Sequence, residues 1–535
     1  MKHLLILAFL FVHSAFALSQ DEGEKYETER TDFMFVLSDG VKLECTKFVP
    51  KGVPPTGGWS AIVFCHGYGG NKEEELPNAK EQAEFGYYTL VYSMRGQGKS
   101  EGKSNLISTL EMRDFIELVN YAKNEENVNP NMVGATGGSQ GGTIPFMAAC
   151  NGLDLRCIVS DVASPEFATS WIENSSVKMT LLWSLSYDTT IVRYNNRVKR
   201  MRHWILSDKP EYWDSLAFYV PLERDFMDRV HLCNTPIMIS TVWQDKFFNT
   251  LGMIKAGQLL NCPFRMYYGT FDAHGADPYE PEMRYQENIT GDWIKYWMGG
   301  IENGVLDSAK YVYAQSVYPI NTSNPPAMWS WTRSYSNSWV PDGTDNVKFF
   351  FNTNGKLSNI PGSEKDIEYR NDIENISLQE AVNREFKGSE FDAKFKKTEL
   401  VFDSEPLGSE LVMAGTPSVF LNYSCNANIA QYNFQIWEIH PDNTTKLITR
   451  INYTDRKIKP GKTKSATFNG LSHSHLFQKG SKIRIVVTNL DNTRDDRFLR
   501  TNPFVLPIMK KSISQIAISG SDASYITLPL VNYTK

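Results

Sequence analysis

The sequence predicts an α/β domain with a helical insertion, followed by a β-sandwich of the jelly-roll type. Between residues 26 and 310, short apolar runs alternate with helical patterns, as in parallel sheets that are covered by helices on both faces. An aromatic segment at residues 165–232 interrupts this alternation. From residue 311 to 535 the pattern changes to short strand-like runs with turn signals between them and without long helices.

The α/β part contains the expected strands as short, fully apolar runs, at residues 62–65, 89–92, 158–160 and 237–239. Between two of them, Ser108 and Glu111 form a capping box that predicts a helix start. The apolar residues after it recur at helical spacing: Met112, Phe115, Val119 and Ala122. In a doubly wound sheet of this kind, active groups are expected in the loops that follow the carboxyl ends of the strands.

The insertion at residues 165–232 is expected to form a helical cap. It is rich in aromatic side chains: Trp171, Trp183, Tyr187, Tyr194, Trp204, Tyr212, Trp213 and Phe218. Most of these rings should fill the core of the cap. A minority should line a substrate pocket, because pockets are largely apolar with a few polar groups.

Composition excludes several classes of protein. A chain of 535 residues with 41% hydrophobic residues exceeds a single core and is not disordered. A net charge of −6 without basic runs argues against a nucleic-acid partner. No spaced set of His, Cys and Asp indicates a metal, and no phosphate-binding glycine loop indicates a cofactor, so neither is expected.

The first 17 residues predict a signal peptide. A basic start is followed by a short apolar core and by Ala15-Phe16-Ala17, which fits a cleavage site. No stretch is long enough to span a bilayer, so no membrane attachment is expected. The predicted destination is the secretory pathway, either outside the cell or in an acidic, lysosome-like vesicle. Sequons suggest N-glycans at Asn174, Asn288, Asn321, Asn375, Asn422, Asn443, Asn452 and Asn532.

Seven cysteines are too few for a disulfide scaffold, and at least one stays unpaired because their number is odd. They are Cys45, Cys65, Cys150, Cys157, Cys233, Cys262 and Cys425. Cys65 lies in an apolar run and is interpreted as a buried free thiol. Cys233 and Cys262 are a candidate pair for a bridge.

The residues Gly137-Gly138-Ser139-Gln140-Gly141 follow an apolar strand-like run and precede small, helix-compatible residues. Glycines around such a serine allow a sharp strand-to-helix turn that lifts the hydroxyl into a cleft. Ser139 is therefore the candidate nucleophile of an α/β-hydrolase domain.

The other two members of a catalytic triad should follow Ser139 in the order acid, then histidine. His274 is the candidate base because it lies in a loop after the last sheet strand. Asp245 is the preferred acid, since it follows the preceding strand and could orient the imidazole. Asp272 and Asp277 are rivals, although Asp272 is only two residues from His274.

Two oxyanion donors are expected. The backbone N–H of Gln140, directly after the nucleophile, would supply one. The second would come from the loop His66-Gly67-Tyr68-Gly69-Gly70, which follows the first clearly buried strand. Either the Tyr68 hydroxyl or a backbone N–H of this loop could serve.

Together these residues resemble the serine hydrolases of the X-Pro dipeptidyl-peptidase and cocaine-esterase type. The similarity includes the Arg-Gly-x-Gly-x-Ser segment at residues 95–100, Ser139 with its glycines, Trp243-Gln244-Asp245, and His274. It extends into the sandwich through residues 402–407 and 438–442. The resemblance implies that Tyr68 contributes its hydroxyl to the oxyanion hole, although His66-Gly67-Tyr68-Gly69 is closer to the general α/β-hydrolase loop.

The expected function is hydrolysis of small peptide amides or esters through an acyl-enzyme at Ser139, with X-Pro dipeptidyl-peptidase-like activity first. A carboxylesterase or acylase of the cocaine-esterase type is the alternative, because the group shares one triad among several substrates. A catalytically inactive binding protein is the non-enzyme alternative, and the sandwich alone could bind carbohydrate. The oligomeric state stays open.

Overall fold

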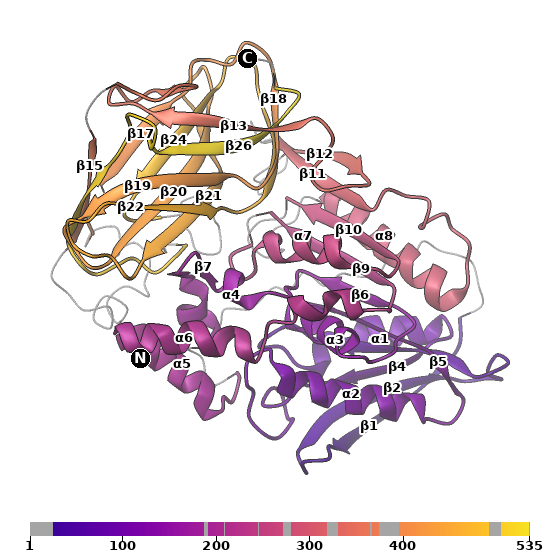
Figure 1. Ribbon diagram of the computed structural model, residues 1–535. Coiled ribbons are helices and arrows are strands. Elements are labelled where there is room, and N and C mark those ends of the chain that lie inside the picture. Colours follow the sequence, from indigo (N-terminus) through magenta and orange to yellow (C-terminus); the bar gives the residue numbers. More distant parts are fainter. Residues whose placement is uncertain are drawn as a thin grey trace.

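A computed structural model describes residues 25–186, 191–207, 209–243, 245–270, 280–317, 330–363, 366–373, 395–396, 398–491 and 504–533. It confirms the predicted fold class, an α/β domain followed by a β-sandwich (Figure 1). The predicted signal peptide at residues 1–17 lies outside the described residues. None of the helices in the described part combines the length and apolarity that a membrane span requires.

The sheet of the α/β domain is antiparallel at its edges and parallel in its centre. Its pairings give the order β1-β2-β4-β3-β5-β6-β9-β10-β11-β12, with parallel pairs from β4 to β11. These strands are β1 (Thr28–Val36), β2 (Lys42–Pro50), β3 (Trp59–Cys65), β4 (Tyr88–Tyr92), β5 (Val128–Gly138), β6 (Ile158–Asp161), β9 (Ile237–Val242), β10 (Phe264–Gly269), β11 (Tyr311–Val317) and β12 (Ser330–Ser336).

Helices cover both faces of this sheet because its central strands are apolar on both sides. On β3, Ile62 and Phe64 pack with α1 (Leu76–Glu84) and α8 (Glu280–Gly299). Ala61 and Val63 belong to the core on the other face, with α2 (Thr109–Lys123), α3 (Gln140–Cys150) and α7 (Thr250–Leu259). The capping box predicted at Ser108 and Glu111 is present at the start of α2.

The segment after β6 contains the predicted helices and also a β-hairpin that the sequence did not predict. Its elements are α4 (Phe167–Ser170), β7 (Ile172–Glu173), β8 (Ser176–Val177), the π-helical turn η2 (Leu181–Leu185), α5 (Asn196–Ser207), α6 (Pro210–Leu222) and the 3-10 segment η3 (Met227–Leu232). The hairpin turn docks on the sandwich, since Asn174 Nδ2 donates to the carbonyls of Asn452 (2.9 Å) and Asn469 (2.7 Å). In Figure 1, α5 and α6 lie beside each other at the edge of the α/β domain.

The sandwich consists of two sheets around one apolar core. One sheet has the order β17-β24-β20-β21, from β17 (Glu399–Asp403), β24 (Lys482–Thr488), β20 (Ala430–Ile439) and β21 (Thr445–Asp455). The other contains β13 (Thr344–Phe351), β14 (Leu357–Ser358), β15 (Ile367–Ile373), β16 (Phe395–Lys396), β18 (Leu411–Gly415), β19 (Ser418–Cys425), β22 (Lys464–Asn469), β23 (His473–Phe477), β25 (Ser512–Ile516) and β26 (Tyr525–Val531). It joins the α/β sheet, because Ser316 and Val317 of β11 pair with His475 and Leu476 of β23.

Candidate active site

Ser139 lies at a sharp turn between β5 and α3, with φ 57° and ψ −118°. A serine in the positive-φ region is strained, and such strain persists only where the surrounding structure enforces it. The Ser139 N–H donates to the carbonyl of Asp161 at the end of β6 (2.8 Å), which fixes the turn. This is the geometry of a nucleophile elbow.

The glycines of the elbow are required by a close approach of strand β3. A Cβ on Gly137 would lie 2.2 Å from the carbonyl oxygen of Cys65, and a Cβ on Gly141 would lie 1.9 Å from the same atom. Neither distance is possible for a real side chain. Gly138 differs, since its nearest neighbour, Asp161 Oδ2, would be 3.6 Å from a Cβ. The Gly-x-Ser-x-Gly pattern is thus explained by packing at its two outer positions.

Asp245 lies just beyond β9, at the same sheet edge as Ser139. It is fully buried, and its Oδ1 accepts hydrogen bonds from the backbone N–H groups of Phe247 (2.7 Å) and Phe248 (3.0 Å). These two donors fix the orientation of the carboxylate. Such an arrangement suits a group that orients a histidine.

His274 lies outside the described residues, as do Gln244 and the rival acids Asp272 and Asp277. The strand before it is described. β10 runs parallel to β9 and ends at Gly269, so the chain leaves β10 at the edge where Ser139 and Asp245 lie. The position of β10 is therefore compatible with the predicted base.

The Tyr68 hydroxyl has a partner in the segment between β6 and β9. It donates to the carbonyl of Leu185 (2.9 Å), and the Tyr194 hydroxyl donates to the same carbonyl. The two tyrosine rings are stacked at 6.4 Å between centroids, and Tyr68 is buried. In this arrangement the Tyr68 hydroxyl is engaged in a contact with η2.

Gln97 connects the loop after β3 with the start of α3, and the sequence analysis did not identify it. This fully buried side chain accepts from the N–H of Gly69 (2.8 Å) and donates to Gln140 Oε1 (3.4 Å). Gln140 is the first residue of α3, so its own backbone N–H has no acceptor within the helix. Gln97 thus links the two segments that are predicted to supply the oxyanion donors.

His66 fixes the same loop from the other side. Its Nε2 accepts from the N–H of Met94 (2.8 Å), which leaves Nδ1 to donate to the carbonyl of Gly67 (2.6 Å). Burial lowers the pKa of His66 to about 4, because the charged form would be desolvated. The imidazole is therefore neutral at pH 7 and has a positioning role.

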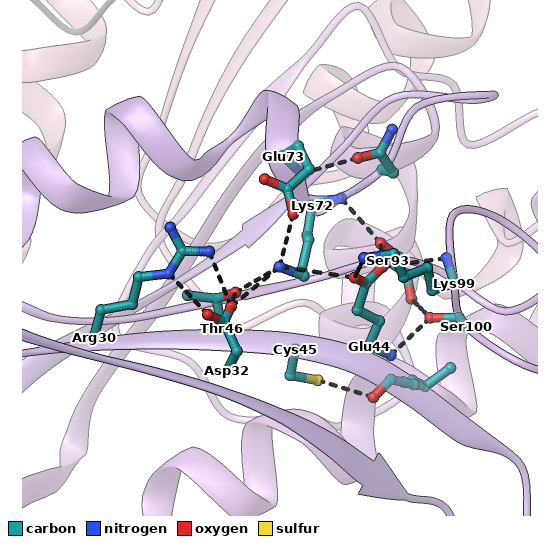
Figure 2. A network of polar contacts seen from close by, with 12 residues as sticks. Arg30, Asp32, Glu44, Cys45, Thr46, Lys72, Glu73, Ser93, Lys99 and Ser100 are labelled. Atoms are coloured by element: carbon teal, nitrogen blue, oxygen red, sulfur yellow. Dashed lines mark hydrogen bonds and ion pairs between the residues drawn. The ribbon is translucent and has the colours of Figure 1, made fainter.

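A network of ion pairs and hydrogen bonds around the buried Lys72 holds the segment that follows this loop (Figure 2). Lys72 is 3% exposed, and its Nζ donates to Thr46 Oγ1 (2.9 Å), Glu73 Oε1 (2.9 Å) and Asp32 Oδ1 (3.2 Å). Its backbone N–H donates to Ser93 Oγ (3.0 Å), just after β4. Strands β1, β2 and β4 thus all anchor the chain near the site.

The Arg-Gly-x-Gly-x-Ser segment has a structural role at its arginine. Arg95 donates through Nε and Nη2 to both carboxylate oxygens of Asp114 (2.7 and 2.6 Å), and through Nη1 to Asp39 (2.8 Å). Gly96 has φ 76°, and a Cβ there would lie 2.6 Å from the N of Ser104. The segment therefore presents Gln97 from a rigid turn.

Two residues near the hairpin support the acid loop and also escaped the sequence analysis. Lys178 Nζ donates to the carbonyl of Asp245 (3.2 Å), and Thr180 Oγ1 donates to the carbonyl of Lys246 (2.8 Å). Burial lowers the pKa of Lys178 to about 8 and raises that of Glu173 to about 7, while each charge favours the ionised form of the other. Among the described residues, no group of three or more His, Cys, Asp or Glu side chains could hold a metal ion.

Comparisons with known protein families match both domains. Residues 39–256 match the X-Pro dipeptidyl-peptidase (S15 family) model, and residues 303–524 match the X-Pro dipeptidyl-peptidase C-terminal non-catalytic domain. Over a 129-residue match at 33% identity, the chain spans 43% of the length of an uncharacterised 31.7 kDa protein of Escherichia coli.

Solved structures of similar fold cover nearly the whole chain. A CocE/NonD family hydrolase from Staphylococcus aureus has a TM-score of 0.70 at 12% identity, over 94% of both chains. An aminopeptidase from a marine sediment Thaumarchaeota archaeon has a TM-score of 0.70 at 15% identity, over 95% of this chain and 97% of its own. An α-amino acid ester hydrolase has a TM-score of 0.68 at 14% identity, over 96% and 100%. The chain belongs to the X-Pro dipeptidyl-peptidase (S15) family of serine hydrolases.

Proposed function

We propose that this serine hydrolase cleaves small peptide amides after an X-Pro unit, through an acyl-enzyme at Ser139. The strained turn at Ser139 is the observation that carries the serine nucleophile, and the match of residues 39–256 to the X-Pro dipeptidyl-peptidase model supports the choice of substrate. The turn places a serine hydroxyl at the carboxyl edge of a parallel sheet, directly before the N-terminus of α3.

In the proposed mechanism His274 accepts the proton of Ser139 Oγ during attack on the scissile carbonyl and returns it to the leaving amine. Asp245 orients His274 and stabilises its cation. The buried carboxylate with two backbone donors supports this role for Asp245. Water then cleaves the acyl-enzyme with the same base.

For the oxyanion hole we propose the backbone N–H groups of Gln140 and Tyr68. Gln140 is favoured because it begins α3, where the N–H points out of the helix end. The hydroxyl of Tyr68 is disfavoured because it already donates to Leu185. Its backbone N–H lies in the loop that His66 and Gln97 fix in place.

We also propose that the chain enters the secretory pathway and carries N-glycans at exposed sequons. Asn288, Asn443 and Asn532 are exposed. Asn452 is fully buried, and its Nδ2 donates to Asn433 Oδ1 (2.9 Å) and Asp491 Oδ2 (2.8 Å). A glycan on that nitrogen would remove one of these two N–H donors and would need space that a fully buried side chain lacks, so Asn452 is not expected to be modified in the folded protein.

The test compares kcat/KM for a Gly-Pro anilide with a free amino terminus, its N-acetylated form, and a short-chain acyl ester. We expect the free-amine anilide to be the preferred substrate, and we expect Ser139→Ala to lose activity on it. A fluorophosphonate probe should label the wild type but not Ser139→Ala, whereas Ser164→Ala, which changes another serine at this sheet edge, should keep the label. Ester turnover without anilide cleavage would favour the esterase, and no labelling would favour an inactive binding protein.

A further inference from the structure

Three cysteine thiols meet at the side of the α/β domain opposite the nucleophile. Cys150 ends α3, Cys233 follows η3 and precedes β9, and Cys262 lies between α7 and β10. All seven cysteines of the chain are free thiols in the structure, so the predicted bridge between Cys233 and Cys262 is not formed there. The structure adds Cys150 as a second neighbour of Cys233.

Backbone and side-chain contacts on both sides hold these cysteines together. Asn261, next to Cys262, donates through Nδ2 to the carbonyl of His231 (3.2 Å). Arg229 donates through Nη1 to Oδ1 of Asn151, next to Cys150 (2.6 Å). The segment that leads into Cys233 is thus tied to the neighbour of each of the other two cysteines.

The thiols themselves interact, with Cys233 in the middle. The Cys233 thiol donates to the carbonyl of Thr235 (3.6 Å), and it interacts with the thiols of both Cys150 and Cys262. This interaction lowers the pKa of Cys233 and raises the pKa values of Cys150 and Cys262, and Cys233 is fully buried. Cys262 is partly exposed, whereas Cys150 is buried. A reagent in solution therefore reaches Cys262 first.

We propose that Cys150, Cys233 and Cys262 form a thiol–disulfide site in which Cys233 bonds first to Cys262 and can exchange to Cys150. The oxidant is a small disulfide, for example glutathione disulfide. Cys262 Sγ attacks it and releases one glutathione thiolate, and Cys233 Sγ then attacks Cys262 Sγ of the mixed disulfide and releases the second. Each released thiolate takes up the proton that the attacking thiol loses, so two protein thiols and one oxidant give one protein disulfide and two glutathione thiols.

The two possible bonds have different structural consequences. The bond between Cys233 and Cys262 joins the segments that enter β9 and β10 and closes a loop of about 30 residues. The bond between Cys150 and Cys233 joins the far end of the nucleophile helix to the entry of β9 and closes a loop of about 85 residues. The longer loop restricts the unfolded chain more, so exchange to Cys150 should raise the unfolding midpoint further.

The experiment oxidises the folded full chain with glutathione disulfide, alkylates the remaining thiols in denaturant, and maps linked peptides by mass spectrometry. We expect Cys233–Cys262 and Cys150–Cys233 links in the wild type and no link in Cys262→Ser, because the two thiols that remain at the site are buried. Cys65 and Cys157, both buried, should be alkylated as free thiols and serve as internal controls. Circular dichroism before oxidation verifies that each sample is folded.

Recovery of Cys233 as a free thiol in the oxidised wild type would overturn the proposal, even if the variant fails to fold. A link between Cys150 and Cys262 that leaves Cys233 free would overturn it as well, because Cys233 is the central thiol. Activity is not part of the readout, so the result is independent of the proposed substrate.

Discussion

Substitution of Gly141 by alanine should destabilise the protein strongly, whereas substitution of Gly138 should not. A Cβ on Gly141 would lie 1.9 Å from the carbonyl oxygen of Cys65, where ordinary contacts begin at 3.4 Å. Helix α3 and strand β3 would have to separate by more than an ångström. Overpacking between two rigid elements costs about 3 kcal/mol. At Gly138 the nearest atom would be 3.6 Å from a Cβ, so alanine should stabilise by up to about 1 kcal/mol through the unfolded state.

The assay is urea denaturation of wild type, Gly138→Ala and Gly141→Ala, followed by tryptophan fluorescence. Comparison of midpoints is sufficient, since a two-domain chain need not unfold in one step. We expect a lower midpoint for Gly141→Ala only. An unchanged midpoint in Gly141→Ala would refute the close approach of α3 and β3. Equal losses in both variants would show that any side chain at the elbow is harmful, whatever its distance from Cys65.

Four further predictions concern the surroundings of the site. Gln97→Leu should lower kcat roughly tenfold or more with a smaller change in KM. The reason is that the substitution removes the acceptor for the N–H of Gly69, beside the proposed oxyanion hole. Steady-state kinetics measures both constants, and a change in KM alone would contradict the prediction. The folded-state pKa of His66 is about 4, below its ordinary value of 6.5. Its contribution to the free energy of unfolding is therefore fully present above pH 6.5, and about 3 kcal/mol of it is lost as the pH falls to 4. Urea midpoints at several pH values check this, and the control His66→Gln should lack this part of the pH dependence. Lys178→Met should destabilise by about 1–3 kcal/mol, because the buried carbonyl of Asp245 loses its donor. An unchanged melting temperature would contradict the role of this hydrogen bond. If the chain is produced in a secretory host, glycopeptide mapping should find occupancy at Asn443 and none at Asn452, and the reverse pattern would contradict the burial of Asn452.

The fold class was predictable because its signals are local. Apolar runs of strand length, a capping box and a change of pattern after residue 310 are all visible within short windows. The hairpin β7–β8 was missed for the opposite reason. It forms where Asn174 and Ser175 adopt φ 44° and 65°, and its stabilising partners lie in the sandwich, almost 300 positions along the chain. Tertiary contacts there override a helical pattern.

The candidate site was predictable in part. Ser139 and Asp245 were identified from motifs that follow strands, and the structure places both at the same sheet edge. Gln97 was missed although it lies within the Arg-Gly-x-Gly-x-Ser segment, because nothing in the local sequence indicates that its amide reaches Gly69 and Gln140. The Leu185 carbonyl that holds the Tyr68 hydroxyl is 117 positions away, so only the structure could weigh the two oxyanion alternatives.

The loop that carries Asp245 is supported by the insertion, by β11 and by Trp339, which follows β12. Lys178 approaches it from the segment that docks on the sandwich. Trp243, two residues before the acid, donates through Nε1 to the carbonyl of Ala314 (2.8 Å) and stacks on Trp339 at 5.4 Å between centroids.

The second domain also contributes to the packing around Trp243. His473 of the sandwich lies 5.9 Å from the Trp243 ring, and both side chains are buried. A buried aromatic cluster of this kind fixes the direction in which the chain leaves β9, because its rings pack without free volume. Removal of the sandwich should expose Trp243 to water and loosen the loop that carries Asp245, so the two domains of this chain are better regarded as one folded unit than as independent modules.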